Sequence, residues 1–543
     1  MRTLHVRWLG RVPYREADEL ARGLHRGSRD HLLLLEHPHV YTLGTTADPS
    51  HVLIDPSAVG AEVICADRGG DVTYHGPGQL VGYPIVSLPE WRDGLRDVVG
   101  YVRTLERVLV HTLIAFGVDA HTERGYTGVW VDDRKIAAIG VRVANGRTRH
   151  GFALNVAPDL EMFDHIVPCG IADRGVTSIE RLLGPDAPSM REVTDLVTGA
   201  FAAELSFAIE RHDVAWRVRA DDVAPFTREG AHHSGVSIRL ERRLAEAGVS
   251  TPVADPTFRR PAWMKVRADL GAEYRDLKRL VRELDLHTVC EEAACPNIYE
   301  CWADRTATFM ILGDRCTRAC GFCQVDTRKP LPLDADEPER VASAVDRLGL
   351  AHAVVTCVAR DDLADGGAGA FAATVAAIRR RTPETRVELL ISDCGGDAAA
   401  LDTVFASRPD VLNHNLETVA RLQRAVRPSA GYARSLAVLA RAKAAGLVVK
   451  SGMIVGMGET DDEVRGALAD LRSVGVDIVT IGQYLRPSAR HLPVARWWTP
   501  DEFDALAADA RGLGFAHVEA GPLVRSSYHA RRAVDGAAEA AHG

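Results

Sequence analysis

Six cysteines between residues 290 and 323 carry the strongest chemical signal in the chain. The first three follow a C-x4-C-x5-C pattern and the last three a C-x3-C-x2-C pattern. Thiolates at such short spacing can bind a common inorganic centre. Each triplet is one ligand short of the four that a four-iron cluster needs, so we predict two centres. The triplets are Cys290, Cys295 and Cys301, followed by Cys316, Cys320 and Cys323.

The C-x3-C-x2-C spacing favours iron–sulfur over zinc. Structural zinc sites use paired C-x2-C motifs and a closed set of four ligands, and this segment lacks that pattern. Three thiolates on a four-iron cluster leave one iron open to a small molecule. The triplet follows a predicted strand at Thr308–Leu312, so we expect it at the carboxyl-terminal mouth of the strands. Zinc and unliganded thiols are the alternatives.

Length and composition limit the class of protein. The chain has 543 residues, which predicts two or more domains. Its 46% hydrophobic and 26% charged residues are typical of soluble globular proteins. The net charge of −9, with dispersed basic residues, argues against a nucleic-acid partner.

The N-terminus, Met1–Arg11, lacks the apolar core of a signal peptide, and the run Leu32–Leu35 is too short to span a bilayer. We therefore expect a cytoplasmic protein without a membrane partner. In a reducing compartment, ten cysteines favour metal binding or catalysis over disulfides. Cys357 and Cys394 have no partner spacing and are predicted to be buried or partly buried.

The first 211 residues mix strand and helix patterns. The segments Gly128–Val131 and Lys135–Ile139 flank a polar turn and predict a hairpin. The run Met190–Ile209 has helical spacing of its apolar residues. Residues 212–257 are polar and predict a linker, with a short helix near Leu240–Ala247.

Strand and helix patterns alternate after the linker, with helices predicted at Pro338–Leu348 and Ala370–Arg380. Repeated strand–helix units predict a parallel sheet, either open or curled into a partial barrel. The Ala-rich end, 533–543, is predicted to be a frayed tail. The predicted strands are Thr308–Leu312, Ala353–Cys357, Val387–Ile391, Val411–Asn413, Val448–Val455 and Asp477–Ile481.

The first half contains one candidate nucleophile, the isolated Cys169 between Pro168 and Gly170, with a structural role as the alternative for a lone cysteine. The proline and the glycine fix a turn that can present the thiol. A cation such as Lys135 favours the thiolate if the fold brings it near. The Gly-rich loop Arg68–Gln79 allows a ligand to approach the backbone, and it lacks the Lys-Ser/Thr ending of a phosphate-binding loop. Cys65 is predicted to lie in the core.

Beside both cysteine triplets, the second half contains the motifs Arg360–Gly367, His414–Thr418, Gly456–Thr460, Gly482–Ser488 and Arg525–Tyr528. Together, over about Arg259 to Arg531, they resemble lipoyl synthase of the radical S-adenosylmethionine (SAM) class. The resemblance implies a partial (β/α)6 TIM-like barrel. It implies that Cys316, Cys320 and Cys323 hold a 4Fe–4S cluster whose open iron binds S-adenosylmethionine. It also implies that Cys290, Cys295, Cys301 and Ser527 hold an auxiliary 4Fe–4S cluster, with Ser526 the alternative ligand.

Motifs of the first half are similar to octanoyl-[acyl carrier protein]:protein octanoyltransferase: Arg68–Gln79, Asp133–Gly140, His150–Asn155 and Pro168–Ile171. The resemblance implies a biotin/lipoate ligase-like α/β fold. It implies that Cys169 carries octanoyl as a thioester and that Lys135 lowers the thiol pKa or shuttles its proton. The implied acyl pocket consists of Arg68, Gly69, Gly70, Asp71, Val72, Thr73, Tyr74, His75, Ala138, Ile139, Gly140, Gly151, Phe152 and Ala153.

Together the two resemblances imply consecutive steps of protein lipoylation in one chain. We expect a transferase at 1–211, a linker at 212–257 and a synthase at 258–532. The implied partners are octanoyl-acyl carrier protein, lipoyl domains of 2-oxoacid dehydrogenase E2 subunits and glycine cleavage H protein, and an electron donor such as ferredoxin or flavodoxin. An ATP-dependent lipoate ligase is the alternative for the first half. An electron-carrying iron–sulfur module or a zinc scaffold is the alternative for the second.

Overall fold

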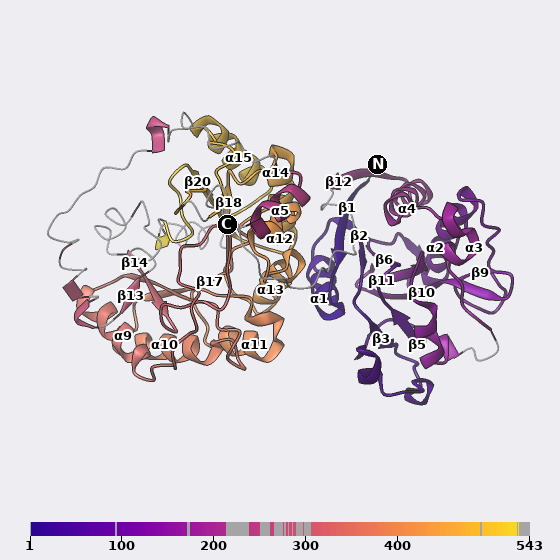
Figure 1. The fold of residues 1–543 in the computed structure, drawn as a ribbon, viewed down its shortest axis with the longest axis horizontal. Coiled ribbons are helices and arrows are strands. Elements are labelled where there is room, and N and C mark those ends of the chain that lie inside the picture. Colours follow the sequence, from indigo (N-terminus) through magenta and orange to yellow (C-terminus); the bar gives the residue numbers. More distant parts are fainter. Residues whose placement is uncertain are drawn as a thin grey trace. The chain divides into compact units, whose positions relative to one another are not determined.

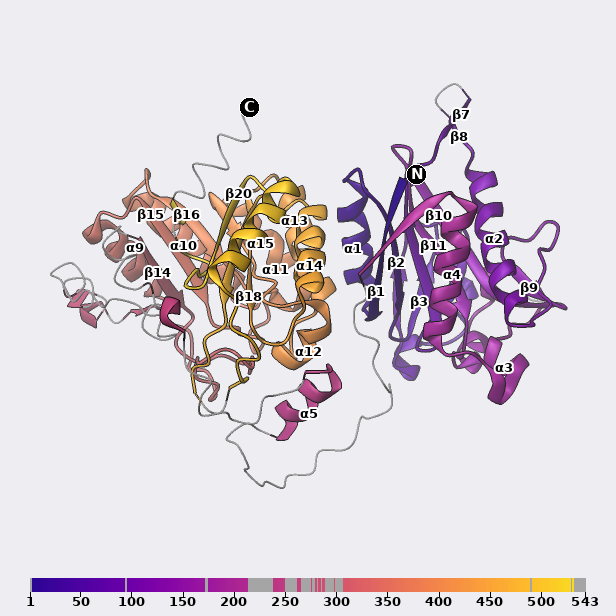
Figure 2. The same cartoon turned by 90° about the horizontal axis from the view of Figure 1, so that it is seen from above.

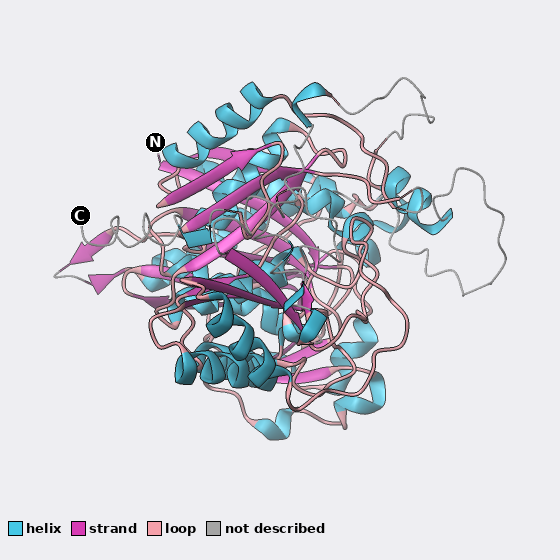
Figure 3. Ribbon diagram, turned by 90° about the vertical axis from the view of Figure 1, so that its left-hand side faces the viewer, coloured by secondary structure: helices cyan, strands magenta, loops and turns pink. Residues whose placement is uncertain are grey.

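The structure is a computed structural model, and its chain divides into two compact units, Met1–Trp216 and Arg217–Gly543. Both units combine helices with strands (Figure 3). The structure describes residues 2–92, 95–170, 174–212, 238–249, 261–264, 275, 279–280, 282–284, 286–288, 297, 306–488, 491–528 and 530–531.

The N-terminal unit is built on a seven-stranded mixed sheet with the order β12-β1-β2-β6-β11-β10-β9. Helix α1 lies on one face of the sheet, and α2 and α4 lie on the other (Figure 2). The elements of this unit are β1 (Arg2–Arg11), α1 (Tyr14–His25), β2 (Asp30–Glu36), β3 (Val40–Leu43), η1 (Pro49–His51), η2 (Pro56–Val59), β4 (Glu62–Cys65), β5 (Val72–His75), β6 (Gln79–Ile85), β7 (Glu90–Arg92), β8 (Leu95–Arg96), α2 (Val98–Ala115), β9 (Val129–Val131), β10 (Arg134–Ala144), β11 (Arg147–Asn155), η3 (Leu160–His165), η4 (Pro168–Gly170), α3 (Ile179–Leu183), η5 (Gly184–Asp186), α4 (Met190–Glu204) and β12 (Phe207–His212).

The apolar run Leu32–Leu35 is the centre of strand β2 and is fully buried. Because helices cover both faces of the sheet, a central strand has no solvent face and needs no polar alternation. The predicted hairpin forms from β9 and β10, and Asp132 in its turn has a positive φ of 53°. This pairing fixes the start of β10, which carries Lys135.

A second, three-stranded sheet, β4-β3-β5, packs its inner face against η3 around Tyr41, Tyr74 and Phe163. Strand β4 is at the edge of this sheet. Ile64 points inward, and its neighbour Cys65 is exposed. The prediction of a core position for Cys65 was wrong, because side chains alternate along a strand and only one face of this edge strand is covered.

The run Met190–Ile209 is helical only as far as Glu204. Phe207–His212 instead forms β12, which pairs in parallel with β1 at the opposite end of the unit's sequence. Helical spacing therefore predicted the start of α4 correctly and its end too late, because a long-range strand pairing decides where the helix stops.

The C-terminal unit is built on an eight-stranded sheet whose strands follow chain order, from β13 to β20. All neighbours from β14 to β20 are parallel, and β13 is antiparallel to β14. Helices lie outside the strands (Figure 1). The elements are α5 (Ile238–Glu246), η6 (Ala262–Met264), β13 (His287–Thr288), β14 (Thr306–Ile311), α9 (Glu337–Leu348), β15 (His352–Cys357), α10 (Ala368–Arg381), β16 (Arg386–Leu390), η7 (Cys394–Gly396), α11 (Ala398–Ala406), β17 (Val411–Asn413), η8 (Ala420–Leu422), α12 (Gln423–Val426), α13 (Tyr432–Ala444), β18 (Val449–Val455), α14 (Asp461–Ser473), β19 (Ile478–Gln483), α15 (Pro500–Gly512) and β20 (His517–Gly521).

The predicted strands are all present, and β20 adds a further parallel strand that the sequence did not reveal. The predicted short helix is α5, whose Leu244 is buried. The Arg421 guanidinium donates to the carbonyl oxygen of Ala247, just after α5. The rest of the predicted linker, 213–237 and 250–257, and the predicted tail lie outside the described residues.

Four polar side chains are fully buried among the parallel strands of this unit. The Lys450 ammonium lies 3.0 Å and 3.2 Å from the two carboxylate oxygens of Glu388, and Asn413 Nδ2 donates to the same carboxylate. His352 Nε2 lies 3.5 Å from it. Burial alone would raise the pKa of Glu388, but the charge of Lys450 and the neighbouring polar groups outweigh it and lower that pKa to about 2. The members come from β15, β16, β17 and β18, so the cluster joins four neighbouring strands, and Asn413 and Lys450 are register partners.

Lys450→Met leaves the Glu388 carboxylate buried without its cation, and we expect a loss of about 3–5 kcal/mol in the free energy of unfolding. Glu388→Gln/Lys450→Met should lose less, because no charge is stranded. Lys443→Met is the matched control, since Lys443 pairs with Asp477 at a half-exposed site. The measurement is urea unfolding of the full chain, with hydrogen exchange in β16 and β18.

The pH dependence follows from the depressed pKa. The contribution of Glu388 is complete above its ordinary value of 4.5 and is lost as the pH falls toward 2. Equal losses in Lys450→Met and Lys443→Met would contradict this account of the cluster.

Candidate functional site

The N-terminal unit contains a cavity of about 420 Å³ between the loop before β5 and the strands β10 and β11. This volume is in the range of small-molecule sites. Its wall has both apolar and polar side chains. The lining residues are Tyr14, Arg68, Gly69, Gly70, Asp71, Thr73, His75, Val81, Tyr83, Gly125, Tyr126, Thr127, Lys135, Ala138, Ile139, Gly140, His150, Gly151, Phe152, Ala153 and Gly170.

Strand β5 divides its residues between this cavity and the core. Thr73 and His75 line the cavity, whereas Val72 and Tyr74 are fully buried in the small core around β3 and η3. Alternation along the strand explains the division. Of the predicted pocket residues, Val72 and Tyr74 are therefore the two that the structure places elsewhere. The other twelve predicted pocket residues line the cavity.

The opposite wall is an antiparallel pair in which Gly140 faces Gly151 and Ile139 faces Phe152. A Cβ atom on Gly151 would lie 2.4 Å from the carbonyl oxygen of Gly82, and one on Gly140 would lie 2.9 Å from that of Gly69. No side chain fits at either position. The glycines are thus required for the close packing of β11 on β6 and of the Gly-rich loop on β10.

Arg68 anchors the Gly-rich loop. Its Nη2 atom donates to the Thr42 carbonyl oxygen at 2.6 Å and to Thr42 Oγ1 at 2.8 Å, and Nε donates to the same hydroxyl at 3.2 Å. The side chain is buried. Arg68 therefore gives the cavity wall its shape through contacts with β3.

Lys135 is buried in the same cavity, with its Nζ atom 4.9 Å from the ring centre of Trp130. Its main chain is bonded to the segment that follows the cysteine turn. Lys135 N–H donates to the Gly175 carbonyl at 2.9 Å, and Thr177 N–H donates to the Lys135 carbonyl at 3.0 Å. Cys169 has its backbone in the turn η4, and its side chain lies outside the described atoms. The adjacent Gly170 lines the cavity with Lys135.

Four aromatic residues of the wall were not predicted as pocket residues from sequence: Tyr14 from α1, Tyr83 from β6, Tyr126 from the loop before β9 and His150 from β11. Tyr83 Oη lies 2.8 Å from His37 Nε2. His150 adjoins the predicted Gly151 and has a positive φ of 55°, which is rare for a non-glycine residue. The predicted His75 is fully buried, and burial holds its pKa well below the ordinary value, so its imidazole is neutral.

The second candidate centre is the loop after β14, where Cys316, Cys320 and Cys323 are partly buried. Its main chain is held on several sides. Cys316 N–H donates to the Asp326 carbonyl at 2.7 Å, and Gly321 N–H donates to the Val426 carbonyl at 2.8 Å. The loop therefore sits at the carboxyl-terminal end of the parallel strands, as the sequence predicts.

The loop offers three cysteine sulfurs as candidate cluster ligands. Cys316 Sγ accepts N–H groups from Arg318 at 3.4 Å and Ala359 at 3.3 Å. Burial raises the pKa of Cys320 and raises that of Cys323 to about 12. A cluster must therefore displace thiol protons when it binds. Three cysteine ligands leave a fourth position for another ligand.

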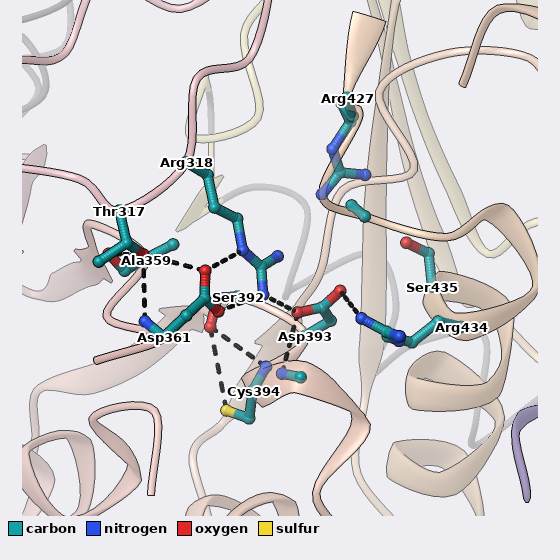
Figure 4. A network of polar contacts seen from close by, with 12 residues as sticks. Thr317, Arg318, Ala359, Asp361, Ser392, Asp393, Cys394, Arg427, Arg434 and Ser435 are labelled. Atoms are coloured by element: carbon teal, nitrogen blue, oxygen red, sulfur yellow. Dashed lines mark hydrogen bonds and ion pairs between the residues drawn. The ribbon is translucent and has the colours of Figure 1, made fainter. Parts of the chain in front are cut away.

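Arg318, inside the cysteine triplet, joins the loop to the segments that follow β15 and β16 (Figure 4). Its Nη2 atom lies 2.6 Å from a carboxylate oxygen of Asp361 and 2.6 Å from one of Asp393, and its Nε donates to Asp361 at 2.8 Å. Asp393 is fully buried, and Arg434 lies 3.5 Å from its other oxygen. Burial alone would raise the pKa of Asp393, but the Arg318 guanidinium lowers it below its ordinary value. The sequence did not single out Asp393.

The Gly456–Gly458 turn after β18 is fixed by Glu459, whose carboxylate accepts the N–H groups of Gly456 and Met457. Trp498 Nε1 donates to the same carboxylate at 3.1 Å, and the tryptophan is buried. Burial raises the pKa of Glu459. Trp498 thus supports the turn through the Glu459 carboxylate.

The first cysteine triplet, Cys290, Cys295 and Cys301, lies outside the described residues. One described residue of that stretch, Asn297, is buried and donates from Nδ2 to the Leu523 carbonyl at 2.6 Å, across 226 positions. Ser526 and Ser527 follow shortly after in a turn. The contact places Asn297 near the segment that carries the predicted serine ligand.

Comparison with known families defines the class of protein. The lipoyl protein ligase A/B catalytic domain matches residues 16–202, and the radical SAM superfamily matches residues 310–471. The N-terminal domain of lipoyl synthase matches residues 246–295. The chain is therefore an enzyme that joins a lipoyl ligase-type α/β domain to a radical SAM unit, whose class uses 4Fe–4S clusters and S-adenosylmethionine. No helix within the described ranges has the length and apolarity to cross a bilayer.

The lipoyl synthase of Mycobacterium tuberculosis (strain ATCC 25618 / H37Rv) is 60% identical over 295 residues, which are 54% of this chain and 92% of that protein. The lipoyl synthase of Mycobacterium avium (strain 104) is 59% identical over 303 residues, 56% of this chain and 96% of that protein. The chain belongs to the lipoyl synthase family, with the additional ligase-type domain in its N-terminal half.

Two solved structures align with part of the chain. Lipoate-protein ligase A bound with ATP is 17% identical and covers 40% of this chain and 90% of its own, with a TM-score of 0.35. Methylornithine synthase is 14% identical and covers 45% of this chain and 81% of its own, with a TM-score of 0.31. At these scores neither adds to the family assignment.

In Arg318→Met, the buried Asp393 carboxylate keeps only Arg434, 3.5 Å away, as a cation. We expect the free energy of unfolding of the C-terminal unit to fall by about 2–4 kcal/mol. The cysteine loop should also retain less iron after anaerobic reconstitution, because it loses the Arg318 contacts with the segments that follow β15 and β16. Arg328→Met is the matched control, since Arg328 is exposed and pairs with Asp326 in the same loop. Iron content and thermal unfolding check the prediction, and equal iron retention in the two variants would contradict it.

Proposed function

We propose that the N-terminal unit transfers octanoyl from acyl carrier protein to a lysine of a lipoyl domain, and that the C-terminal unit then inserts two sulfur atoms into that chain. The observation that carries the proposal is the shared cavity of Lys135 and Gly170, next to Cys169. Val81, Ile139 and Phe152 give the cavity apolar surface for an acyl chain.

In the first step, the Cys169 thiolate attacks the carrier's thioester and keeps the acyl group as an enzyme thioester. The buried Lys135 ammonium favours the thiolate and can return a proton to the departing carrier thiol. The target lysine then displaces Cys169 and forms the amide. The alternative is an ATP-dependent lipoate ligase, which would need no Cys169. Acyl transfer without ATP separates the two.

For the second step, Cys316, Cys320 and Cys323 would hold a 4Fe–4S cluster whose open position would bind S-adenosylmethionine. With its electron donor, that pair would supply the radical chemistry needed to remove hydrogen from unactivated carbons. Cys290, Cys295, Cys301 and Ser527 would hold the second cluster, which would be the sulfur source, with Ser526 the alternative ligand. Insertion at the sixth and eighth carbons completes the lipoyl group. A ferredoxin or flavodoxin supplies electrons, and the acceptors are 2-oxoacid dehydrogenase E2 and glycine cleavage H proteins in the cytoplasm.

Cys169→Ser should abolish hydroxylamine-sensitive octanoyl labelling, because the thioester cannot form. Cys65→Ser is the matched control: Cys65 is an exposed thiol in the same unit and should not affect labelling. The measurement is intact mass after treatment with octanoyl-carrier protein without ATP. Hydroxylamine-sensitive labelling that persists in Cys169→Ser would contradict the assignment of Cys169 as the nucleophile.

Replacing both Ser526 and Ser527 with alanine should leave S-adenosylmethionine cleavage in place and stop sulfur insertion, because only the second cluster loses a ligand. The unchanged chain should hold about eight iron atoms after reconstitution. Product mass and 5′-deoxyadenosine yield report the two activities separately. Undiminished sulfur insertion in the double variant would refute the serine ligand.

A further inference from the structure

His51 and Asp71 form a hydrogen-bonded pair at the edge of the cavity. His51 Nδ1 lies 2.6 Å from Asp71 Oδ2. The other oxygen, Oδ1, accepts the N–H groups of Asp48 at 3.1 Å and Val72 at 2.7 Å. The carboxylate is therefore fixed by the loop and presents His51 in one orientation, with Nε2 on the far side of the ring from the Nδ1 contact.

The pair is packed against the turn that carries Cys169. A Cβ atom on Gly170 would lie 2.7 Å from Asp71 Oδ2 and 3.5 Å from His51 Cε1. Gly170 has a positive φ of 71°, so the position favours glycine on two grounds. The main chain adds a link, because Val167 N–H donates to the His51 carbonyl at 2.8 Å. The pair thus adjoins the residue next to the nucleophile.

The charges around the cavity divide into two kinds. Lys135 is a cation suited to a thiolate, and the Arg68 guanidinium is bonded to Thr42. Among the described lining residues, Asp71 is the one carboxylate. Its side chain is 14% exposed and that of His51 is 28% exposed, so the pair is reachable from solvent. The Asp71 carboxylate can attract a cationic group to the edge of the cavity. The acyl acceptor of the proposed reaction is such a group, a lysine ammonium.

We propose that the His51–Asp71 pair receives the target lysine and removes the proton that blocks its attack. The inference rests on the proposed transferase function and names the group that activates its second substrate. The ammonium gives one proton to His51, and the Asp71 carboxylate stabilises the imidazolium. The free amine forms the C–N bond as the C–S bond breaks. The amine's second proton goes to the leaving Cys169 sulfur, and His51 returns its proton to solvent.

Other titratable groups surround His51 and take part in its environment. Asp48 lies on the same short helix, η1, and accepts N–H and O–H bonds from Ser50. His165 ends η3, and its carbonyl accepts the N–H of Leu53. His165 Nδ1 is bonded to Tyr41 Oη at 3.0 Å. Asp71 is thus the direct partner of the imidazole, with Asp48 as a second nearby carboxylate.

The test separates the two half-reactions in the full-length enzyme. Octanoyl-carrier protein first loads the chain, and the acyl-enzyme is then mixed with an unmodified lipoyl domain over a range of pH. The variants are His51→Gln and Asp71→Asn, and the matched control is Asp55→Asn, which changes an exposed carboxylate on η2 that caps its own helix. Thermal unfolding confirms that each variant is folded.

We expect loading within about twofold of the unchanged chain in His51→Gln, and transfer slowed by about 100-fold near neutral pH in both variants. The deficit in transfer should shrink as the pH rises, because more of the lysine is then already a free amine. In His51→Gln, loading and transfer slowed together, or transfer unchanged, would overturn the inference while leaving the thioester intact. Absence of any acyl-enzyme in the unchanged chain would overturn the proposed function as well.

Discussion

Main-chain hydrogen bonds that hold each cysteine-bearing turn to a neighbouring strand are the constraint on which both sites depend. In the N-terminal unit, the Lys135 backbone is bonded to Gly175 and Thr177, beyond the Cys169 turn. In the C-terminal unit, Thr317 N–H donates to the Ala359 carbonyl at 2.9 Å, within the cysteine triplet. A cysteine thiol forms only weak hydrogen bonds, so it cannot fix its own position. The main-chain hydrogen bonds therefore fix the turns that carry the cysteines.

The two units position the loops of their candidate sites with different kinds of sheet. The antiparallel pair β10 and β11 brings glycines face to face, so a loop and a ligand can approach the backbone closely. The parallel strands β14 to β20 end at one edge, and each contributes a loop to that edge. Charged residues then fix those loops, as Arg318 does between Asp361 and Asp393. Under the proposed function, covalent fusion would raise the concentration of one unit near the other's product and so favour consecutive steps on one acyl chain.

Local patterns predicted much of this architecture. The strand Val411–Asn413 has the predicted bounds, and the cysteine loop follows β14 as expected. Several features that the sequence did not predict depend on contact between distant residues, and others depend on strand alternation. Strand β12 exists because it pairs with β1, and the contact of Asn297 with Leu523 spans 226 positions. Tyr74 lies in the core because of strand alternation, which a loop motif does not reveal. The pairing of His51 with Asp71 likewise depends on the fold.

One sample tests the central claim that a single chain performs both steps. The reconstituted chain is incubated with octanoyl-carrier protein, an unmodified lipoyl domain, S-adenosylmethionine and a reductant, and the lipoyl domain is analysed by mass spectrometry over time. The account predicts an octanoylated domain first and a domain with two added sulfur atoms later, with Cys169→Ser blocking both and loss of Cys316, Cys320 and Cys323 blocking only the second. A chain that never octanoylates the domain, or octanoylates it and never adds sulfur, would contradict the account.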